Sequence, residues 1–181
     1  AEVGKYMVAL QITMAVPIIM TAVNTAYAPW LFERLKRNDP VEASRVTGGA
    51  LIICSALILM AISSLFIGAW LINLLAGEGY ETGGMVFGWL ALGQAFSGMY
   101  LIVANYVYFS MNTGGLSIVT MVSGAINILL LLLLVGEYGA LGAAIAFALS
   151  MALRFLLAWR FAQACHPMPW FRPKFTAKFP G

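Results

Sequence analysis

The sequence predicts an all-α membrane protein, a polytopic helical bundle with five transmembrane helices. Of the 181 residues, 62% are hydrophobic and only 9% are charged, whereas soluble domains carry about 25% charged residues. The mean hydropathy is +0.90. A soluble core could not hide this much apolar surface, so we expect lipid to be the solvent. Crossing a bilayer as a helix takes about 20 apolar residues, and five stretches qualify: residues 6–32, 47–75, 84–111, 116–135 and 140–161.

Short polar segments connect these five helices. They read ERLKRNDPVEASR, AGEGYETGG, NTGG and GEYG, and Pro, Gly, Asn and acidic residues are typical of turns. We therefore assign residues 1–164 to one transmembrane region and residues 165–181 to a cytoplasmic tail. The chain opens AEVGKYMVAL, without the basic segment and cleavage site of a signal peptide. We expect it to be part of a longer protein.

Basic residues are divided unevenly between the connections. They gather in the first connection and after the fifth helix, as Arg34, Lys36, Arg37, Arg45, Arg160, Arg172, Lys174 and Lys178. The second and fourth connections carry Glu78, Glu81 and Glu137 but no Lys or Arg. Since cytoplasmic segments carry the excess of Lys and Arg, we expect the first connection and the C-terminus in the cytoplasm.

Polar side chains follow one face of the third predicted helix. At about 100° per residue, the positions within about 60° of one line are Gln94, Ser97, Leu101, Asn105, Tyr108 and Asn112. The first helix has a similar stripe, formed by Thr13, Pro17, Thr21, Asn24 and Ala28. Two roles stay open for Gln94, Asn105 and Asn112. They either join neighbouring helices by hydrogen bonds or line a wet cavity.

The last two helices also carry polar faces. Ser117, Thr120, Gly124 and Asn127 share a side of the fourth helix, which is typical of helix packing, and Ser150 and Arg154 share one on the fifth. Arg154 lies about 21 Å along its helix from the outer end. It is either an anchor that snorkels to the membrane surface or a positive charge at the floor of a cavity.

Pro17 interrupts the first helix at membrane depth. A proline removes one backbone hydrogen bond and kinks the helix, which frees a carbonyl group that needs another partner. Kinked helices occur both in transporters and in static bundles. Pro17 is therefore a hinge candidate, with a fixed bend as the alternative.

Several classes of chemistry lack their residues in this sequence. All seven acidic residues lie in connections or near helix ends, and no G-x-x-x-x-G-K-[ST] phosphate loop occurs. Cys165 and His166 are adjacent, but no further Cys or His stands at metal-ligand spacing. We expect no enzyme activity, no cofactor, no metal site and no nucleic-acid partner.

Several motifs follow one another along the chain up to about residue 161: VGKYMVAL, AYAPWLFERL, LLAGEGY, LALGQAFSGMYLIVANYVYFSMNTGGLSIVT, GAIN and EYGALGAAIAFALS. Their order resembles that of the C-terminal part of polysaccharide transporters. This family contains the O-antigen and exopolysaccharide flippases of the multidrug/oligosaccharidyl-lipid/polysaccharide exporter superfamily. The resemblance implies that the five helices form most of the C-terminal lobe of a larger transporter in the bacterial inner membrane. Such a protein moves undecaprenyl-pyrophosphate-linked oligosaccharide by alternating access, and its partners would be membrane lipids and an N-terminal lobe of the same chain.

If the family is right, the polar residues become candidates for the substrate path. They are Thr21, Asn24, Gln94, Asn105, Tyr108, Asn112 and Arg154. The alternatives are a drug/cation antiporter or a peptidoglycan-precursor flippase of the same superfamily, a membrane polysaccharide polymerase or ligase, and a packing subunit. An antiporter would be favoured by a carboxylate at membrane depth, and a polymerase or ligase needs a sizeable periplasmic loop.

The orientation can be tested with single cysteines. Those placed between Arg34 and Arg45, or after Arg172, should resist a membrane-impermeant thiol reagent in intact cells, because we expect these segments in the cytoplasm. Cysteines near Glu78 and Glu137 should react. Labelling of the first connection from outside would overturn both the orientation and the family assignment.

Overall fold

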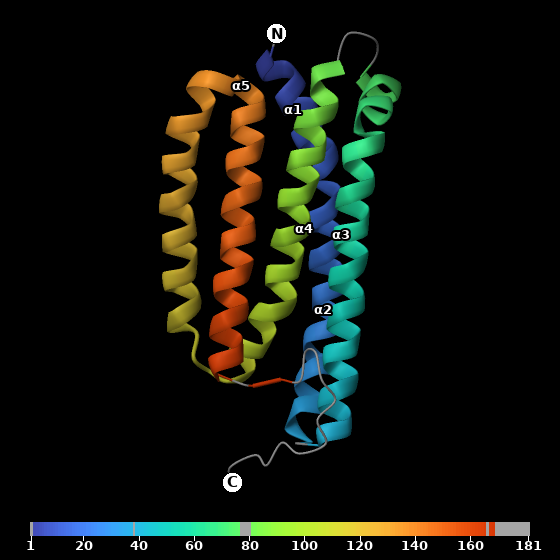
Figure 1. Ribbon diagram of the computed structural model, residues 1–181. Coiled ribbons are helices and arrows are strands. Elements are labelled where there is room, and N and C mark those ends of the chain that lie inside the picture. The colour runs from blue at the N-terminus through green and yellow to red at the C-terminus, as the bar shows by residue number, and fades with distance from the viewer. Residues whose placement is uncertain (1, 38, 77–80, 166, 169–181) are drawn as a thin grey trace.

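The computed structural model describes residues 2–37, 39–76, 81–165 and 167–168, and it confirms the all-α prediction. Its elements are all helices (Figure 1): α1 (Glu2–Thr13), α2 (Ala15–Lys36), α3 (Pro40–Ala76), α4 (Glu81–Phe109) and α5 (Gly114–Cys165). The second connection at residues 77–80, with Glu78, lies outside the described residues. So do residues 166 and 169–181, which form most of the expected tail.

The expected count of five spans is not matched. Four helical segments are long and apolar enough to cross a membrane: Ala9–Lys36, Val41–Gly68, Gly83–Phe109 and Gly114–Cys165. The difference lies in α5, whose 52 residues include both of the last two predicted helices. The chain reverses at Gly139, where φ is 54°, a conformation that glycine adopts without strain. Figure 1 shows the resulting antiparallel arms, the first arm (residues 114–138) and the second arm (residues 140–165).

The first predicted helix is also interrupted. Helix α1 ends at Thr13 and α2 begins at Ala15, so the break falls at Met14, three residues before Pro17. A proline ring clashes with the carbonyl group four residues earlier, here that of Thr13, which explains why the break precedes the proline. The Met14 amide still donates to the Leu10 carbonyl at 3.0 Å. The kink is therefore local, and motion about it stays a prediction.

Helix α4 is the centre of the bundle. It packs against each of the other four helices, and Figure 1 shows it between α3 and the second arm of α5. Within the most apolar window of each span, 72% of α4 is buried, against 11–17% in the other three. Its fully buried side chains include Leu90, Met99, Ile102, Val103, Tyr106 and Val107. Helix α4 is thus shielded from lipid, while its neighbours form the outer surface.

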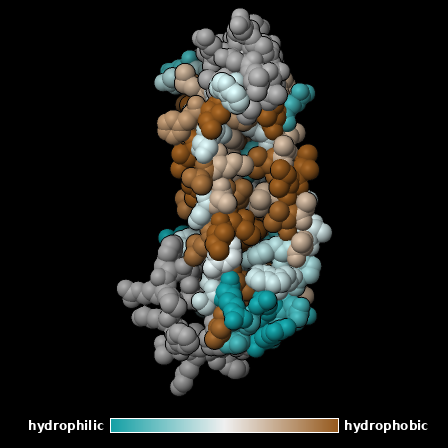
Figure 2. All heavy atoms as spheres, turned by 90° about the vertical axis from the view of Figure 1, so that its right-hand side faces the viewer, coloured by the Kyte–Doolittle hydropathy of each residue, from teal (hydrophilic) through white to brown (hydrophobic). Residues whose placement is uncertain are grey.

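Large apolar side chains cover that outer surface. Many of them lie on α3 and the first arm, including Ile52, Leu59, Phe66, Trp70, Met121, Leu132 and Leu133. Figure 2, which views the α3 side, shows hydrophobic residues across the middle of this face and hydrophilic residues toward one end. Each Å² of such surface left in water would cost about 25 cal/mol. This exposed apolar surface is that of a membrane-embedded protein.

The α2–α3 turn and the end of α5 lie at the same end of the bundle, opposite the reversal at Gly139 (Figure 1). We call this the basic end; its described basic residues are Arg34, Lys36, Arg37, Arg45 and Arg160. Glu42 accepts hydrogen bonds from Arg45 within α3 and from Arg34 of α2, and the contact with Arg34 ties α2 to α3. Arg172, Lys174 and Lys178 lie outside the described residues. Which side of a membrane the basic end faces stays a prediction.

The close approach of the two arms of α5 can be tested at Gly142. A Cβ atom at this position would overlap the backbone carbonyl of Leu134, whereas one at Gly136 would meet nothing within 4 Å. Gly142→Ala should therefore lower the free energy of unfolding by about 1–3 kcal/mol, measured by thermal unfolding in detergent. Gly136→Ala is the matched control and should be neutral or stabilise by up to about 1 kcal/mol. Equal stability of the two variants would contradict the close packing of the arms.

Candidate functional site

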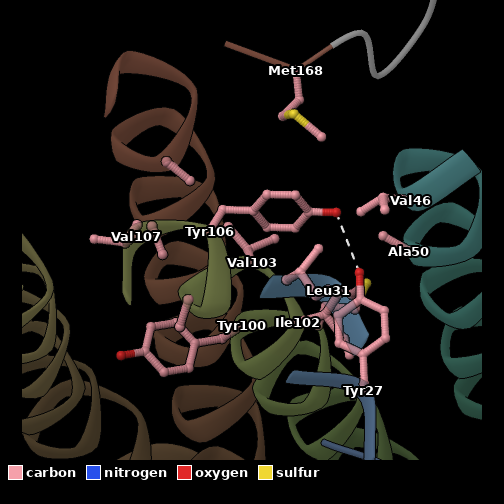
Figure 3. Close-up of a cluster of buried hydrophobic side chains, with 14 of the residues drawn as sticks. Tyr27, Leu31, Val46, Ala50, Tyr100, Ile102, Val103, Tyr106, Val107 and Met168 are labelled. Carbon is pink, nitrogen blue, oxygen red and sulfur yellow. Dashed lines mark hydrogen bonds between the residues drawn. The ribbon is translucent and has the colours of Figure 1, made fainter. Parts of the chain in front are cut away.

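Two polar pairs join α2 to α4 within the apolar core. The Asn105 side-chain amide donates to the Asn24 side-chain oxygen at 2.7 Å, and the hydroxyl oxygens of Tyr27 and Tyr106 are 3.3 Å apart. Figure 3 shows the two tyrosines pointing toward each other across the cluster. Asn105 is only 3% exposed, and an unpaired amide in an apolar medium costs about 2–7 kcal/mol. Its contact with Asn24 is the one that a packing role predicts.

The polar stripe predicted on the third helix does not form one continuous surface. Gln94 and Asn105 are buried, but Tyr108 is 47% exposed. Helix α4 ends at Phe109, and the backbone turns at Met111 with a φ of 59°. Asn112 therefore lies beyond the helix, where its amide contacts the Cys165 sulfur at 3.8 Å. The extrapolated stripe fails there because the helix has already ended.

Thr21 lies on the exposed face of α2. Its hydroxyl donates to the Pro17 carbonyl at 2.8 Å, and the Thr25 hydroxyl donates to the Thr21 carbonyl at the same distance. Both hydroxyl donors are thus satisfied within their own helix, which allows this face to meet lipid or another apolar helix. A path role for Thr21 stays a prediction.

Three polar contacts at successive levels link the chain on either side of the α5 reversal. The first is Asn112 with Cys165, the next is Arg154 with Thr120, and the one nearest the reversal is Asn127 with Ser150. In the last, the Asn127 amide donates to the Ser150 hydroxyl at 2.8 Å, and that hydroxyl donates to the Phe147 carbonyl. Thr120 and Asn127 therefore pack the first arm against the second.

Of these three contacts, the one made by Arg154 leaves a buried hydrogen-bond donor without a partner. Its guanidinium carbon lies 4.0 Å from the centroid of the Tyr100 ring, and its Nη2 donates to the Thr120 hydroxyl at 3.3 Å. Its Nε is buried without a hydrogen-bond partner. Within the described part of the chain no carboxylate forms an ion pair with it. The Arg154 cation is thus held by the face of the Tyr100 ring and by the Thr120 hydroxyl, and its Nε donor has no hydrogen-bond partner.

The position of this cation is set by packing against α4. Tyr100 is 6% exposed, so its ring is fixed within the core. Thr120 lies six residues into α5, which places the contact about 9 Å along the axis from the start of that helix. The guanidinium therefore lies along the helical span, against α4 on one side and at the exposed Thr120 hydroxyl on the other. Its two expected roles, a snorkelling anchor and a cavity cation, both stay predictions.

The sequence analysis missed three of the residues described here: Tyr27, Tyr100 and Tyr106. Their hydroxyl groups and rings contact residues on other helices, and helical periodicity alone does not reveal such partners. The positions of two of them gave a partial indication, because Tyr106 directly follows the candidate Asn105 and Tyr27 lies one helical turn after the candidate Asn24.

Comparison with known protein families, with curated proteins and with solved structures finds no match to this chain. The functional evidence therefore comes from the polar contacts themselves. The resemblance to polysaccharide transporters stays a prediction.

A double-mutant cycle can distinguish the two possible roles of the Asn24–Asn105 pair, which are helix packing and the lining of a wet path. If the pair only packs, Asn105→Leu should destabilise by about 1–3 kcal/mol, because it leaves the Asn24 amide without its partner. The double variant Asn24→Leu/Asn105→Leu should then lose less free energy of unfolding than the sum of the losses in the two single variants. Thermal unfolding in detergent measures all three.

A wet path predicts a different result. Water would solvate the amide that remains, so each single change would be tolerated and the two effects would add. Strictly additive effects would contradict the packing role.

Proposed function

We propose that the chain forms the membrane-embedded part of a transporter that moves a lipid-linked oligosaccharide with an anionic pyrophosphate group across the bacterial inner membrane. The observation that carries the proposal is Arg154, a partly buried cation within a helical span that has no carboxylate partner among the described residues. The family resemblance of the sequence supports the same substrate class.

Packing alone does not explain an arginine at this position. The contacts of Asn112 with Cys165 and of Asn127 with Ser150 link the same segments with neutral side chains. Moving an ionised group out of water costs several kcal/mol even after the protein relaxes. Charged residues within transmembrane segments commonly mark the pathways of substrates and ions. The charge of Arg154 therefore favours a ligand rather than a structural contact.

The shape of the group favours a phosphate. A guanidinium presents several donors in one plane, and this fork matches the oxygens of phosphate. The Tyr100 ring supports one face of that plane, and the buried Nε lacks a partner. A cation stacked on an aromatic ring stays ordered, at a gain of about 0.5–2 kcal/mol. Arg154 would thus meet the pyrophosphate while the lipid tail of the substrate stays in the bilayer.

A drug/cation antiporter is the second candidate, and the placement of carboxylates argues against it. Among the acidic residues with described side chains, Glu33, Asp39 and Glu42 lie at the α2–α3 turn, and Glu137 lies beside the reversal of α5. None of these lies midway along a span, where a transported cation would need a counter-charge. The balance of charge inside the bundle therefore favours an anionic substrate.

The proposal is tested by substituting Arg154 in the full-length protein, in cells that lack any other exporter of the glycan. Arg154→Gln should lower export per molecule at least about tenfold, which corresponds to ~1.4 kcal/mol. Arg154→Lys should keep part of the activity, since it keeps the charge but loses the planar fork. Surface glycan and protein abundance are measured together.

Tyr100 supplies the matched pair for this test. Tyr100→Phe should export normally because it keeps the ring, whereas Tyr100→Leu should be impaired. Normal export per molecule by Arg154→Gln would refute the proposal.

A further inference from the structure

The chain returns to the core of the bundle after α5 has ended. Met168 follows the last residue of α5, Cys165, by only three positions, yet it is 4% exposed. It belongs to the same buried cluster as Tyr27, Leu31, Val46 and Tyr106, which come from α2, α3 and α4. In Figure 3 its side chain points toward the ring of Tyr106. The Met168 side chain thus connects the end of α5 to α2, α3 and α4 at the basic end of the bundle.

Gln163 holds this residue in place. Its side-chain nitrogen donates to the Met168 carbonyl, and its side-chain oxygen accepts from the Met168 amide, each at 3.3 Å. A buried backbone amide and carbonyl both need partners, and a single amide side chain satisfies both here. Met168 can therefore enter an apolar cluster although it belongs to no helix.

The contact lies over buried polar groups. The Tyr27–Tyr106 hydroxyl pair and the Asn24–Asn105 amide pair follow each other along α2 and α4. Met168 lies against the cluster that contains both tyrosines, on the side where α5 ends. An unbranched, flexible methionine is suited to filling an irregular gap of this kind.

We propose that Met168 is a removable plug that closes the buried polar pairs of α2 and α4 to water from the basic end of the bundle. Among the described residues, the two hydrogen bonds from Gln163 and the apolar contacts of the Met168 side chain hold it. None of these is a backbone hydrogen bond of a helix, so Met168 can leave while the helices stay intact. Its release would admit water to the Tyr27–Tyr106 pair while α2, α3 and α4 remain folded. This inference concerns access to the α2–α4 interface and does not depend on the substrate.

Cys54 is a built-in reporter of that access. It lies on α3, partly buried, and packs against the cluster that contains Tyr27 and Tyr106. The sequence has only one other cysteine, Cys165. The change Cys165→Ser leaves Cys54 as the single thiol of these 181 residues and keeps an acceptor for Asn112, and any cysteine elsewhere in the full-length protein is also changed to Ser.

The test is the rate at which a water-soluble maleimide labels Cys54 in the purified full-length protein in lipid nanodiscs. In the Cys165→Ser background, Met168→Ala and Gln163→Ala should each raise this rate by about tenfold or more. Met168→Leu should keep the original rate, because it refills the cluster. Met121→Ala is the matched control: Met121 is 74% exposed on the first arm of α5, so its loss should leave labelling unchanged.

Helix content and the thermal midpoint are measured on the same samples. A higher labelling rate with unchanged helix content in either plug variant supports the proposal, so it survives if Met168→Ala alone fails to fold. An unchanged rate in both variants would overturn it. An equal rise in Met121→Ala would also overturn it, because the effect would then be general loosening.

Discussion

The requirement that polar groups in lipid find partners inside the protein governs this bundle. Helix α4 meets it by lying at the centre, where its polar side chains reach neighbouring helices. Asn105 pairs with Asn24, and Tyr106 with Tyr27. Where no neighbour is available, as for Thr21 on the outer face of α2, the hydroxyl donates to a carbonyl of its own helix. The same requirement decides which faces can meet lipid and which cannot.

Arg154 is the exception that connects this requirement to function. The other polar contacts across the α5 reversal are neutral, whereas Arg154 keeps a buried donor without a partner. A charge in this position would be selected against if the site served packing alone, because an uncharged side chain could bond to Thr120 at a lower desolvation cost. Tyr100 and Thr120 reduce that cost but do not remove the charge. The buried Nε without a partner is the observation behind our proposal of an anionic substrate.

The sequence predicted the helical segments well, because their length and composition depend on local residues. The expected count of five spans was not matched, because the last two stretches both fall within α5, which the reversal at Gly139 divides into two antiparallel arms. Neither periodicity nor hydropathy identified the central helix. The hydropathy of the α4 span is 1.5, but that of the Ala9–Lys36 span is 1.4 although only 17% of its window is buried. The partners of Asn105 and Arg154 depend on which helices adjoin α4, and no stripe on one helix encodes that.

The break at Met14 separates two helices, α1 and α2, that pack in different hydrophobic clusters. Ala9 of α1 belongs to a small cluster with Leu90 of α4 and Ala144 of the second arm. Helix α2 belongs instead to the large cluster, and two polar pairs fix it to α4. The kink before Pro17 therefore falls between two packing units rather than within one. Bending there would shift α1 against the part of α4 near Leu90, while α2 stayed attached to the part near Asn105 and Tyr106. The cost would fall on the apolar contacts of the small cluster, because the polar pairs of α2 and α4 would remain intact.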